Sequence, residues 1–341
     1  MRAAVYIGNR ALRVEDRDPV PPGPGEVQIA VAYAGICGTD LHIRHGAMDD
    51  RALPPAVLGH EAVGRIAALG AGVSGWRVGD PVTVMPLRWC GDCAACRAGH
   101  NHVCQRLRVL GVDLPGAMQA RWTVPADVVL RLPEEVPLAD AALVEPTAVA
   151  VHDVRRAEVR AGEHVVVVGA GPIGLLIAVV AAAEGAEIVV VEPDPYRRGV
   201  AERLGLAAVD PTSTDVPAYV AERTAGAGAA VAFEVSGSPA GMRIATDVLG
   251  VRGRLVVVAI HPDPVPVDLN QVFLRELTVL GARVYARADV ERAIELVHRG
   301  VVPARELVSR IVPLSAVAEA FDALESADGV VKVLLDCQAA G

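Results

Sequence analysis

The sequence predicts an α/β protein that combines a mostly β domain with a doubly wound parallel sheet. Residues 1 to about 145 contain short strand-like runs separated by Pro and Gly, whereas from about 160 strands alternate with helical stretches. A glycine-rich segment, Gly169-Ala-Gly171-Pro-Ile-Gly174, joins the first strand and helix of the alternating part. At 341 residues the chain is long enough for two domains, each with its own core.

The N-terminal part is expected to be irregular, with its clearest strands at Val27–Ala34, Ala62–Leu69 and Pro81–Met85. The alternating part holds six expected strands: His164–Val168, Glu187–Val191, Ala207–Val209, Ala229–Val235, Arg254–Ile260 and Leu277–Gly281. Six strands with helices between them are typical of a doubly wound sheet. Beyond about 284 we expect helices over Asp289–Arg299 and Leu314–Leu324 and a closing strand over Val330–Leu335.

Four cysteines lie within a short segment: Cys90, Cys93, Cys96 and Cys104. Gaps of two, two and seven residues leave little room for regular structure, so the segment is expected to be an irregular lobe at about 88–106 folded around a structural zinc ion. The alternatives are two disulfides or four unrelated thiols. Adjacent Cys-x-x-Cys pairs rarely form good structural disulfides, which favours zinc.

The glycine-rich segment has the spacing of a dinucleotide-binding turn. Gly169 permits the tight turn, Gly171 lets the backbone approach a pyrophosphate, and Gly174 permits close helix packing. Pro172 and Ile173 open the helix, whose N-terminus would face the phosphates.

Glu192 ends the next hydrophobic strand, where an acid that binds a ribose diol is expected. A carboxylate there repels a 2′-phosphate, so NAD is favoured over NADP. Arg197 and Arg198 temper this preference, because either could flank the adenosine.

Two further segments complete a family pattern: Gly35-Ile-Cys37-Gly-Thr39-Asp-Leu-His42 and Gly59-His60-Glu61-Ala-Val-Gly64. Together with the four-cysteine lobe and the glycine turn, in this order, they resemble the zinc-dependent medium-chain dehydrogenase/reductase family. The resemblance covers essentially the whole chain and is closest to the polyol branch, which includes sorbitol, 2,3-butanediol and threonine dehydrogenases.

The resemblance implies a second, catalytic zinc ion. Cys37 and His60 match two of its ligands, and Glu61 matches the third ligand of polyol-type members. Glu145 stands where many alcohol dehydrogenases carry a cysteine ligand. Which of the two glutamates would bind the metal directly stays open. A catalytic zinc ion needs three protein ligands and one exchangeable position, which these residue types can provide.

The resemblance also assigns two residues to the substrate. Thr39 matches a hydroxyl that contacts the substrate oxygen, and His42 matches an imidazole that relays the proton. Asp40 is expected to stiffen the loop by hydrogen bonding.

The implied architecture is a GroES-like catalytic domain, residues 1–148 and 284–341, with a Rossmann domain, residues 149–283, inserted in it. Relatives form dimers through the strand near Leu277–Gly281, so a homo-oligomer is expected, a tetramer more than a dimer.

Composition limits the partners. The net charge is −9, and Lys332 is the only lysine among 32 basic residues, so no clustered basic patch is evident. Nucleic acid and membrane are therefore not expected as partners. No basic segment followed by an apolar stretch opens the chain, which favours the cytoplasm.

Taken together, these features predict a zinc-dependent oxidoreductase. It would transfer hydride between a small-molecule secondary alcohol (a polyol, vicinal diol, sugar or amino alcohol) and NAD, giving the ketone. One alternative is an alcohol dehydrogenase for an apolar or cyclic secondary alcohol of secondary metabolism. Another, of a different class, is a catalytically silent regulator that binds a dinucleotide.

Overall fold

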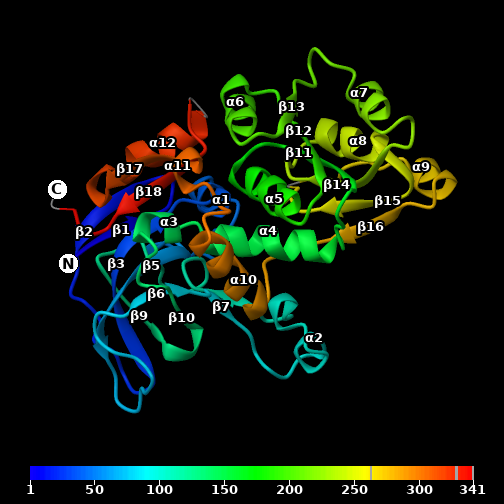
Figure 1. The fold of residues 1–341 in the computed structure, drawn as a ribbon. Helices are drawn as coiled ribbons and strands as arrows, with labels where there is room; N and C mark the ends of the chain where they lie inside the picture. The colour runs from blue at the N-terminus through cyan, green and yellow to red at the C-terminus, as the bar shows by residue number, and fades with distance from the viewer. Residues whose placement is uncertain (262, 327–328, 340–341) are drawn as a thin grey trace. The chain divides into compact units, whose positions relative to one another are not determined.

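The computed structural model describes residues 1–261, 263–326 and 329–339, which belong to two compact units (Figure 1). The first unit comprises Met1–Glu145, Ala286–Gly300 and Val308–Gly341, and the second comprises Pro146–Tyr285 and Val301–Leu307. The domain bounds at 148 and 284 that the resemblance implies stay predictions.

The first unit is built on a sheet in which β10, β6, β5, β3, β18 and β17 follow one another, with β9 also paired to β3. The strands of this sheet are β3 (Glu26–Gly35), β5 (Glu61–Leu69), β6 (Pro81–Val84), β9 (Arg121–Pro125), β10 (Val129–Arg131), β17 (Val308–Pro313) and β18 (Lys332–Asp336). The C-terminal β18, red in Figure 1, thus lies beside the N-terminal β3, blue. Val27, Ile29 and Val31 alternate along β3 and point into the core, as a half-buried strand requires.

Smaller elements complete this unit. They are β1 (Arg2–Tyr6), β2 (Leu12–Asp16), β4 (Ala56–Val57), β7 (Leu87–Arg88) and β8 (Arg108–Val109), the 3-10 turns η1 (Asn101–Val103), η2 (Ala126–Val128) and η3 (Leu314–Ala316), and the helices α1 (Gly38–Arg44), α2 (Ala94–Arg97), α3 (Leu138–Ala141), α10 (Arg287–His298) and α12 (Val317–Ser326). The predicted helix from Leu314 therefore starts as a 3-10 turn, and the closing strand starts only at Lys332.

The second unit contains a six-stranded sheet of order β13-β12-β11-β14-β15-β16, in which all neighbours are parallel. Its strands are β11 (His164–Val168), β12 (Glu187–Val191), β13 (Ala207–Val209), β14 (Ala229–Glu234), β15 (Leu249–Val257) and β16 (Thr278–Gly281). Its helices are α4 (Val144–Arg156, from Pro146 on), α5 (Pro172–Ala183), α6 (Pro195–Arg203), α7 (Val216–Arg223), α8 (Pro239–Asp247), α9 (Leu269–Leu274) and α11 (Ala304–Leu307). This is the doubly wound order, so the predicted α/β fold is confirmed.

Among the strands of the parallel sheet, β15 differs most from its prediction. β15 starts at Leu249 and ends at Val257, before the predicted end at Ile260. The N–H groups of Val258 and Ala259 both donate to the carbonyl of Glu234, which takes the chain out of the ladder.

The uncharged run Val165–Ala183 is divided by the glycine turn into β11 and the buried helix α5. Within the described residues, no helix has both the length and the apolar character needed to cross a bilayer.

Candidate functional site

The lobe brings its four cysteines together. Cys93 caps the N-terminus of α2, Cys96 lies on that one-turn helix, and Cys104 follows η1. The sulfur of Cys90 lies 3.4 Å from that of Cys104 and 3.9 Å from that of Cys96, and the sulfurs of Cys93 and Cys104 are 3.8 Å apart. Four thiolates that bind one zinc ion at 2.3 Å have sulfurs about 3.8 Å apart. All four are free thiols, so the geometry fits zinc and not disulfides.

The thiols of the lobe differ in acidity although they share a residue type. Backbone N–H groups of Cys96 and Gln105 stabilise the thiolate of Cys93 and lower its pKa to about 6. Burial, together with the hydrogen bond to Cys93, raises the pKa of Cys96 to about 12. Without metal, the lobe therefore holds both thiolates and thiols near neutral pH.

A second group of metal-binding type joins Cys37, His60 and Glu61, whose donor atoms all lie within 4.8 Å of one another. Cys37 caps the N-terminus of α1 after the end of β3, while Glu61 is the first residue of β5 and His60 directly precedes it. The register pairs Gly35 of β3 with Glu61 of β5, which brings the two segments together. One sulfur, one nitrogen and one carboxylate oxygen form a donor set that zinc accepts, with a fourth position left for another ligand.

Asp40 links the two segments of this group. Its Oδ2 accepts a hydrogen bond from the N–H of Cys37 at 2.9 Å, and its Oδ1 lies 3.8 Å from Nδ1 of His60. Burial disfavours the imidazolium form of His60, but the charges of Asp40, Cys37 and Glu145 outweigh it and raise the pKa of His60 well above its usual value. A carboxylate behind one imidazole nitrogen leaves the other free for a metal. Asp40 thus hydrogen-bonds within the loop and also places a buried carboxylate beside His60.

The remaining predicted residues of this site lie on helices. Glu145 is buried in the first turn of α4 and is close enough to affect the pKa of His60, but it lies outside the group of three donors. Thr39 and His42 are half-buried on α1, three positions apart and therefore on one face of the helix.

One residue of this site, Lys332, was not predicted from the sequence. Its side chain is 1% exposed and forms an ion pair with Glu61, and its Nζ donates to the carbonyl of Ile36 at 2.9 Å. The signal was present in the sequence, since the only lysine of the chain opens the apolar run Lys332-Val-Leu-Leu.

The glycine turn has the geometry that a dinucleotide needs. Gly169 has φ of 107°, which L side chains rarely adopt. A Cβ at Gly174 would lie 1.9 Å from the carbonyl oxygen of Gly169, whereas a Cβ at Gly171 would meet nothing within 4 Å. Gly171 caps α5, with Pro172 and Ile173 in the first turn. The turn therefore leaves open space at the residue where a pyrophosphate is expected.

Glu192 is buried directly beside this turn. Its Oε2 accepts from the N–H of Ala170 at 2.7 Å, and its Oε1 accepts from the N–H of Asp194 at 2.9 Å. Arg198 donates to the carbonyls of Glu192 and Pro193 and pairs with Asp210 at 3.2 Å.

Arg197 differs from its neighbour Arg198. It is half-buried, and its Nε has no hydrogen-bond partner among the described residues. Of the two arginines, Arg197 is therefore the one that a cofactor could still engage.

A second acid, which was not predicted from the sequence, ends a strand at the carboxyl edge of the parallel sheet. Glu234 of β14 is fully buried and accepts hydrogen bonds from the N–H groups of Ser236 and Gly237, and His261 contacts its other oxygen at 2.9 Å. Because β14 is parallel to β11, this pair lies at the same carboxyl edge as the glycine turn. Like Glu192, Glu234 follows a run of apolar residues, and that is the signal that could have found it.

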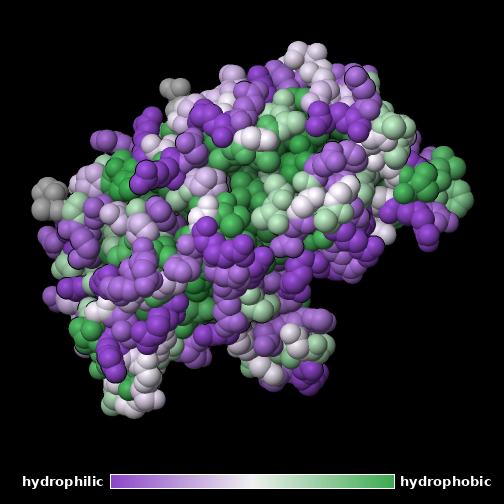
Figure 2. Space-filling model, in the orientation of Figure 1, coloured by the Kyte–Doolittle hydropathy of each residue, from purple (hydrophilic) through white to green (hydrophobic). Residues whose placement is uncertain are grey.

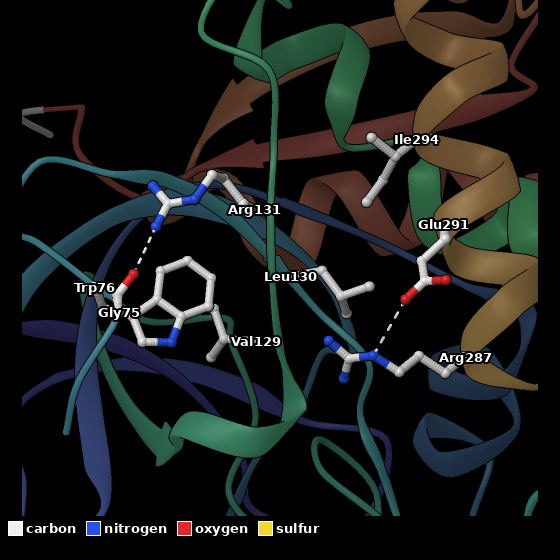
Figure 3. A pocket seen from close by; sticks show the side chains of 8 residues that line it. All are labelled: Gly75, Trp76, Val129, Leu130, Arg131, Arg287, Glu291 and Ile294. Atoms are coloured by element: carbon white, nitrogen blue, oxygen red, sulfur yellow. Dashed lines mark hydrogen bonds and ion pairs between the residues drawn. The ribbon is translucent and has the colours of Figure 1, made fainter. Parts of the chain in front are cut away.

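The first unit also contains a surface hollow of about 530 Å³ that includes none of these residues (Figure 3). Its eight lining residues are Gly75, Trp76, Val129, Leu130, Arg131, Arg287, Glu291 and Ile294. Arg131 stacks on Trp76 at 4.7 Å and pairs with Asp80, and Arg287 pairs with Glu291. Both arginines are thus already engaged, so the lining offers no unpaired charge to a ligand.

Comparisons with known proteins cover both units. Residues 23–134 match the model of the alcohol dehydrogenase GroES-like domain, and residues 172–299 match that of the zinc-binding dehydrogenase. The chain is 47% identical to a 2-dehydro-3-deoxy-L-galactonate 5-dehydrogenase of Pseudoalteromonas atlantica over 339 residues, 99% of each chain. It is 33% identical to the L-galactonate-5-dehydrogenase of Escherichia coli over 302 residues, 88% of each. The crystal structure of 2R,3R-butanediol dehydrogenase from Bacillus subtilis matches 98% of this chain and 99% of its own, with a TM-score of 0.91 and 34% identity.

Proposed function

Because the chain belongs to the zinc-binding dehydrogenases with an alcohol dehydrogenase GroES-like domain, we propose that it oxidises a secondary hydroxyl of a sugar acid or related polyol to the ketone, with reduction of NAD. The resemblance drawn from the sequence motifs is thereby confirmed, and with it the class of enzyme, an oxidoreductase that acts on CH–OH groups. The observation that carries the proposal is the convergence of Cys37, His60 and Glu61 from two separate segments.

We assign the metal-binding role of this site to Cys37, His60 and Glu61, because their donor atoms already lie within 4.8 Å of one another. Zinc bound there supplies a Lewis acid toward the hydroxyl oxygen, and a bound nicotinamide supplies the hydride acceptor. Glu145 would act from the edge of the group through its charge. The four cysteines of the lobe, Cys90, Cys93, Cys96 and Cys104, would hold the second, structural zinc ion.

The substrate hydroxyl has to lose a proton as its carbon loses hydride. Thr39 and His42 are suited to this step, because they share one face of α1, which begins directly after Cys37. The Thr39 hydroxyl would hydrogen-bond the substrate oxygen, and the His42 imidazole would carry the proton away from it. Both side chains are half-buried, as a path between a site and solvent requires.

NAD is favoured over NADP by the surroundings of Glu192. Its carboxylate is fixed by two backbone N–H groups beside the glycine turn, where a ribose diol can donate to it and a 2′-phosphate would be repelled. Arg198 is engaged by two carbonyls and Asp210, so it is not available to a 2′-phosphate. Arg197 remains the residue that could contact the adenosine.

The substrate class is inferred from relatives. The 47% identical relative is named for a 2-dehydro-3-deoxy sugar acid, and a 33% identical one for an unmodified sugar acid. Both names place the reacting hydroxyl at carbon 5. A small, polyhydroxylated acid is accordingly the substrate that we propose for this chain.

We also propose that the enzyme is a cytoplasmic homo-oligomer, tetrameric or dimeric. β16 is the edge strand of the parallel sheet, and Leu269, Phe273 and Leu274 of α9 next to it are exposed, Phe273 to 79%. In Figure 2, which has the orientation of Figure 1, a green, apolar group lies at the place of α9. An edge strand flanked by exposed apolar side chains favours pairing with a second copy.

The proposed cytoplasmic location is supported by the cysteines. All six are free thiols, which suits a reducing compartment.

The proposal can be tested by measuring zinc per chain together with turnover. Two zinc ions per chain are expected, with NADH formed from sugar acids such as galactonate and its 2-dehydro-3-deoxy derivative faster than from hexitols, 2,3-butanediol, threonine or cyclohexanol. Faster turnover of cyclohexanol would instead support the apolar-alcohol alternative. A protein that holds two zinc ions but turns over none of these alcohols would overturn the catalytic reading in favour of a silent regulator.

The cofactor assignment has its own test in the Glu192→Gln variant. Loss of a charged hydrogen-bond acceptor should lower kcat/KM for NAD about tenfold or more and narrow the gap to NADP. Glu187→Gln is the matched control, because Glu187 starts the same strand but is exposed. An unchanged NAD to NADP ratio in Glu192→Gln would show that the adenosine is selected elsewhere.

A further inference from the structure

A buried cation, Lys332, lies against the candidate catalytic group, and the proposed reaction assigns it no role. Lys332 and Glu61 are each 1% exposed, and their side chains form an ion pair. A buried ion pair gives up the hydration of both charges, and packed apolar residues often do as well or better for stability. Lys332 is also the only lysine of the chain. Stability alone is therefore a weak reason for this pair.

The pair spans three strands. Glu61 begins β5, Lys332 begins β18, and β3 lies between these two strands. The last residue of β3, Gly35, is paired with Glu61 of β5 on one side and with Leu334 of β18 on the other. A Cβ at position 35 would lie 2.0 Å from Oε2 of Glu61 and 3.0 Å from Cε of Lys332. The two side chains can meet only because the middle strand carries no side chain at this point.

The same lysine reaches the segment that carries Cys37. Its Nζ donates to the carbonyl of Ile36, the residue directly before Cys37. In this buried place the carboxylate of Glu61 balances the charge of the Lys332 ammonium. Lys332 is thus a fixed positive charge among the acidic groups of the site.

We propose that Lys332 is a positioning residue that, through the space left by Gly35, holds the Glu61 carboxylate between itself and the metal group and so limits how strongly Glu61 binds the metal. The inference rests on the proposed function, because it takes the metal at Cys37, His60 and Glu61 to be zinc. A carboxylate shared with an ammonium group donates less charge to a metal than a free one. Zinc then keeps more of its Lewis acidity for the substrate.

The test is the zinc affinity of full-length Lys332→Met protein, measured with zinc alone by competition with a chelator. Methionine keeps the length and apolar stem of the side chain but removes the charge. Affinity at the catalytic group should rise about tenfold or more, because Glu61 loses the partner that competes with the metal for its carboxylate. The Cys37→Ser protein identifies which of the two zinc ions is being measured.

Two matched variants separate positioning from a merely structural role. Lys332→Arg keeps the charge and should keep the zinc affinity within about threefold of wild type. In the Glu61→Gln background, adding Lys332→Met should change the affinity by no more than about threefold, because the group through which it acts is already neutral. The double variant leaves no unpaired buried charge, since Gln and Met are both neutral, whereas Glu61→Gln alone leaves the Lys332 ammonium without its carboxylate. Thermal unfolding of each protein is therefore compared before its zinc affinity.

The results also separate this inference from the proposed function. If wild-type protein binds only one zinc ion, the proposed catalytic site fails. If it binds two but Lys332→Met leaves the affinity of the second unchanged, or tightens it equally in the Glu61→Gln background, then Lys332 is a structural residue and the inference is overturned.

Discussion

The two groups that could hold a metal in the first unit are built in opposite ways. In the lobe, four residues of one type come from a single short segment, and backbone N–H groups of Cys90 and Arg106 donate to the sulfur of Cys104. In the other group, three residue types come from two segments that are joined by the pairing of β3 with β5, and buried charges surround them.

This difference corresponds to two kinds of chemistry. Four thiolates complete a tetrahedron, so a metal in the lobe has no position left for a substrate and can only stabilise the fold. As proposed ligands, Cys37, His60 and Glu61 would leave one position open, while Asp40 accepts a hydrogen bond from the N–H of Cys37 and Lys332 pairs with Glu61. The comparison therefore predicts that damage to one group lowers stability, whereas damage to the other lowers activity.

The largest effect is expected for Cys37→Ser. Loss of this ligand should lower kcat/KM at least about a thousandfold, because a Lewis acid contributes several kcal/mol to the transition state and each 1.36 kcal/mol is tenfold in rate. Steady-state kinetics measure the loss. The unfolding temperature and the zinc of the lobe should stay near wild type. A variant that keeps its activity would place the catalytic metal elsewhere and end the distinction between the two groups.

A smaller effect, of the opposite kind, is expected for Cys93→Ser. The free energy of unfolding should fall by several kcal/mol, because the binding free energy of a structural zinc ion is folding free energy. Thermal unfolding and zinc per chain measure it. Cys337→Ser is the control, since Cys337 is buried but joins neither group. Equal losses of stability in both variants would mean that the lobe binds no structural metal.

The smallest effect concerns pH. Zinc binding must displace the proton of Cys96, whose pKa is about 12, so the zinc affinity of the lobe should rise with pH, about tenfold per unit from this thiol alone between 7 and 8. Below about 6 the slope should steepen, because Cys93, with a pKa of about 6, then binds a proton as well. Proton release measured in weak buffer at pH 7.5 checks this. No released proton would contradict a thiol at Cys96.

The two groups also differ in how well the sequence predicts them. The lobe could be predicted from spacing alone, since its cysteines are close together in the sequence. The parallel sheet could be predicted because the valine-rich strands around Gly169 are also a local pattern. The ion pair of Glu61 with Lys332 could not, because its partners are far apart in the sequence and meet only across Gly35. The contact of Glu234 with His261 depends in the same way on the packing of β14 beside β15.

The burial of the only lysine has a practical consequence for labelling. In the folded protein, an amine-reactive ester cannot reach the Nζ of Lys332, which is 1% exposed. This amine can be labelled only when β18 separates from its neighbours in the sheet. The fraction of chains whose mass shows this label, followed over time, would therefore measure how fast the first unit opens, without any engineered probe.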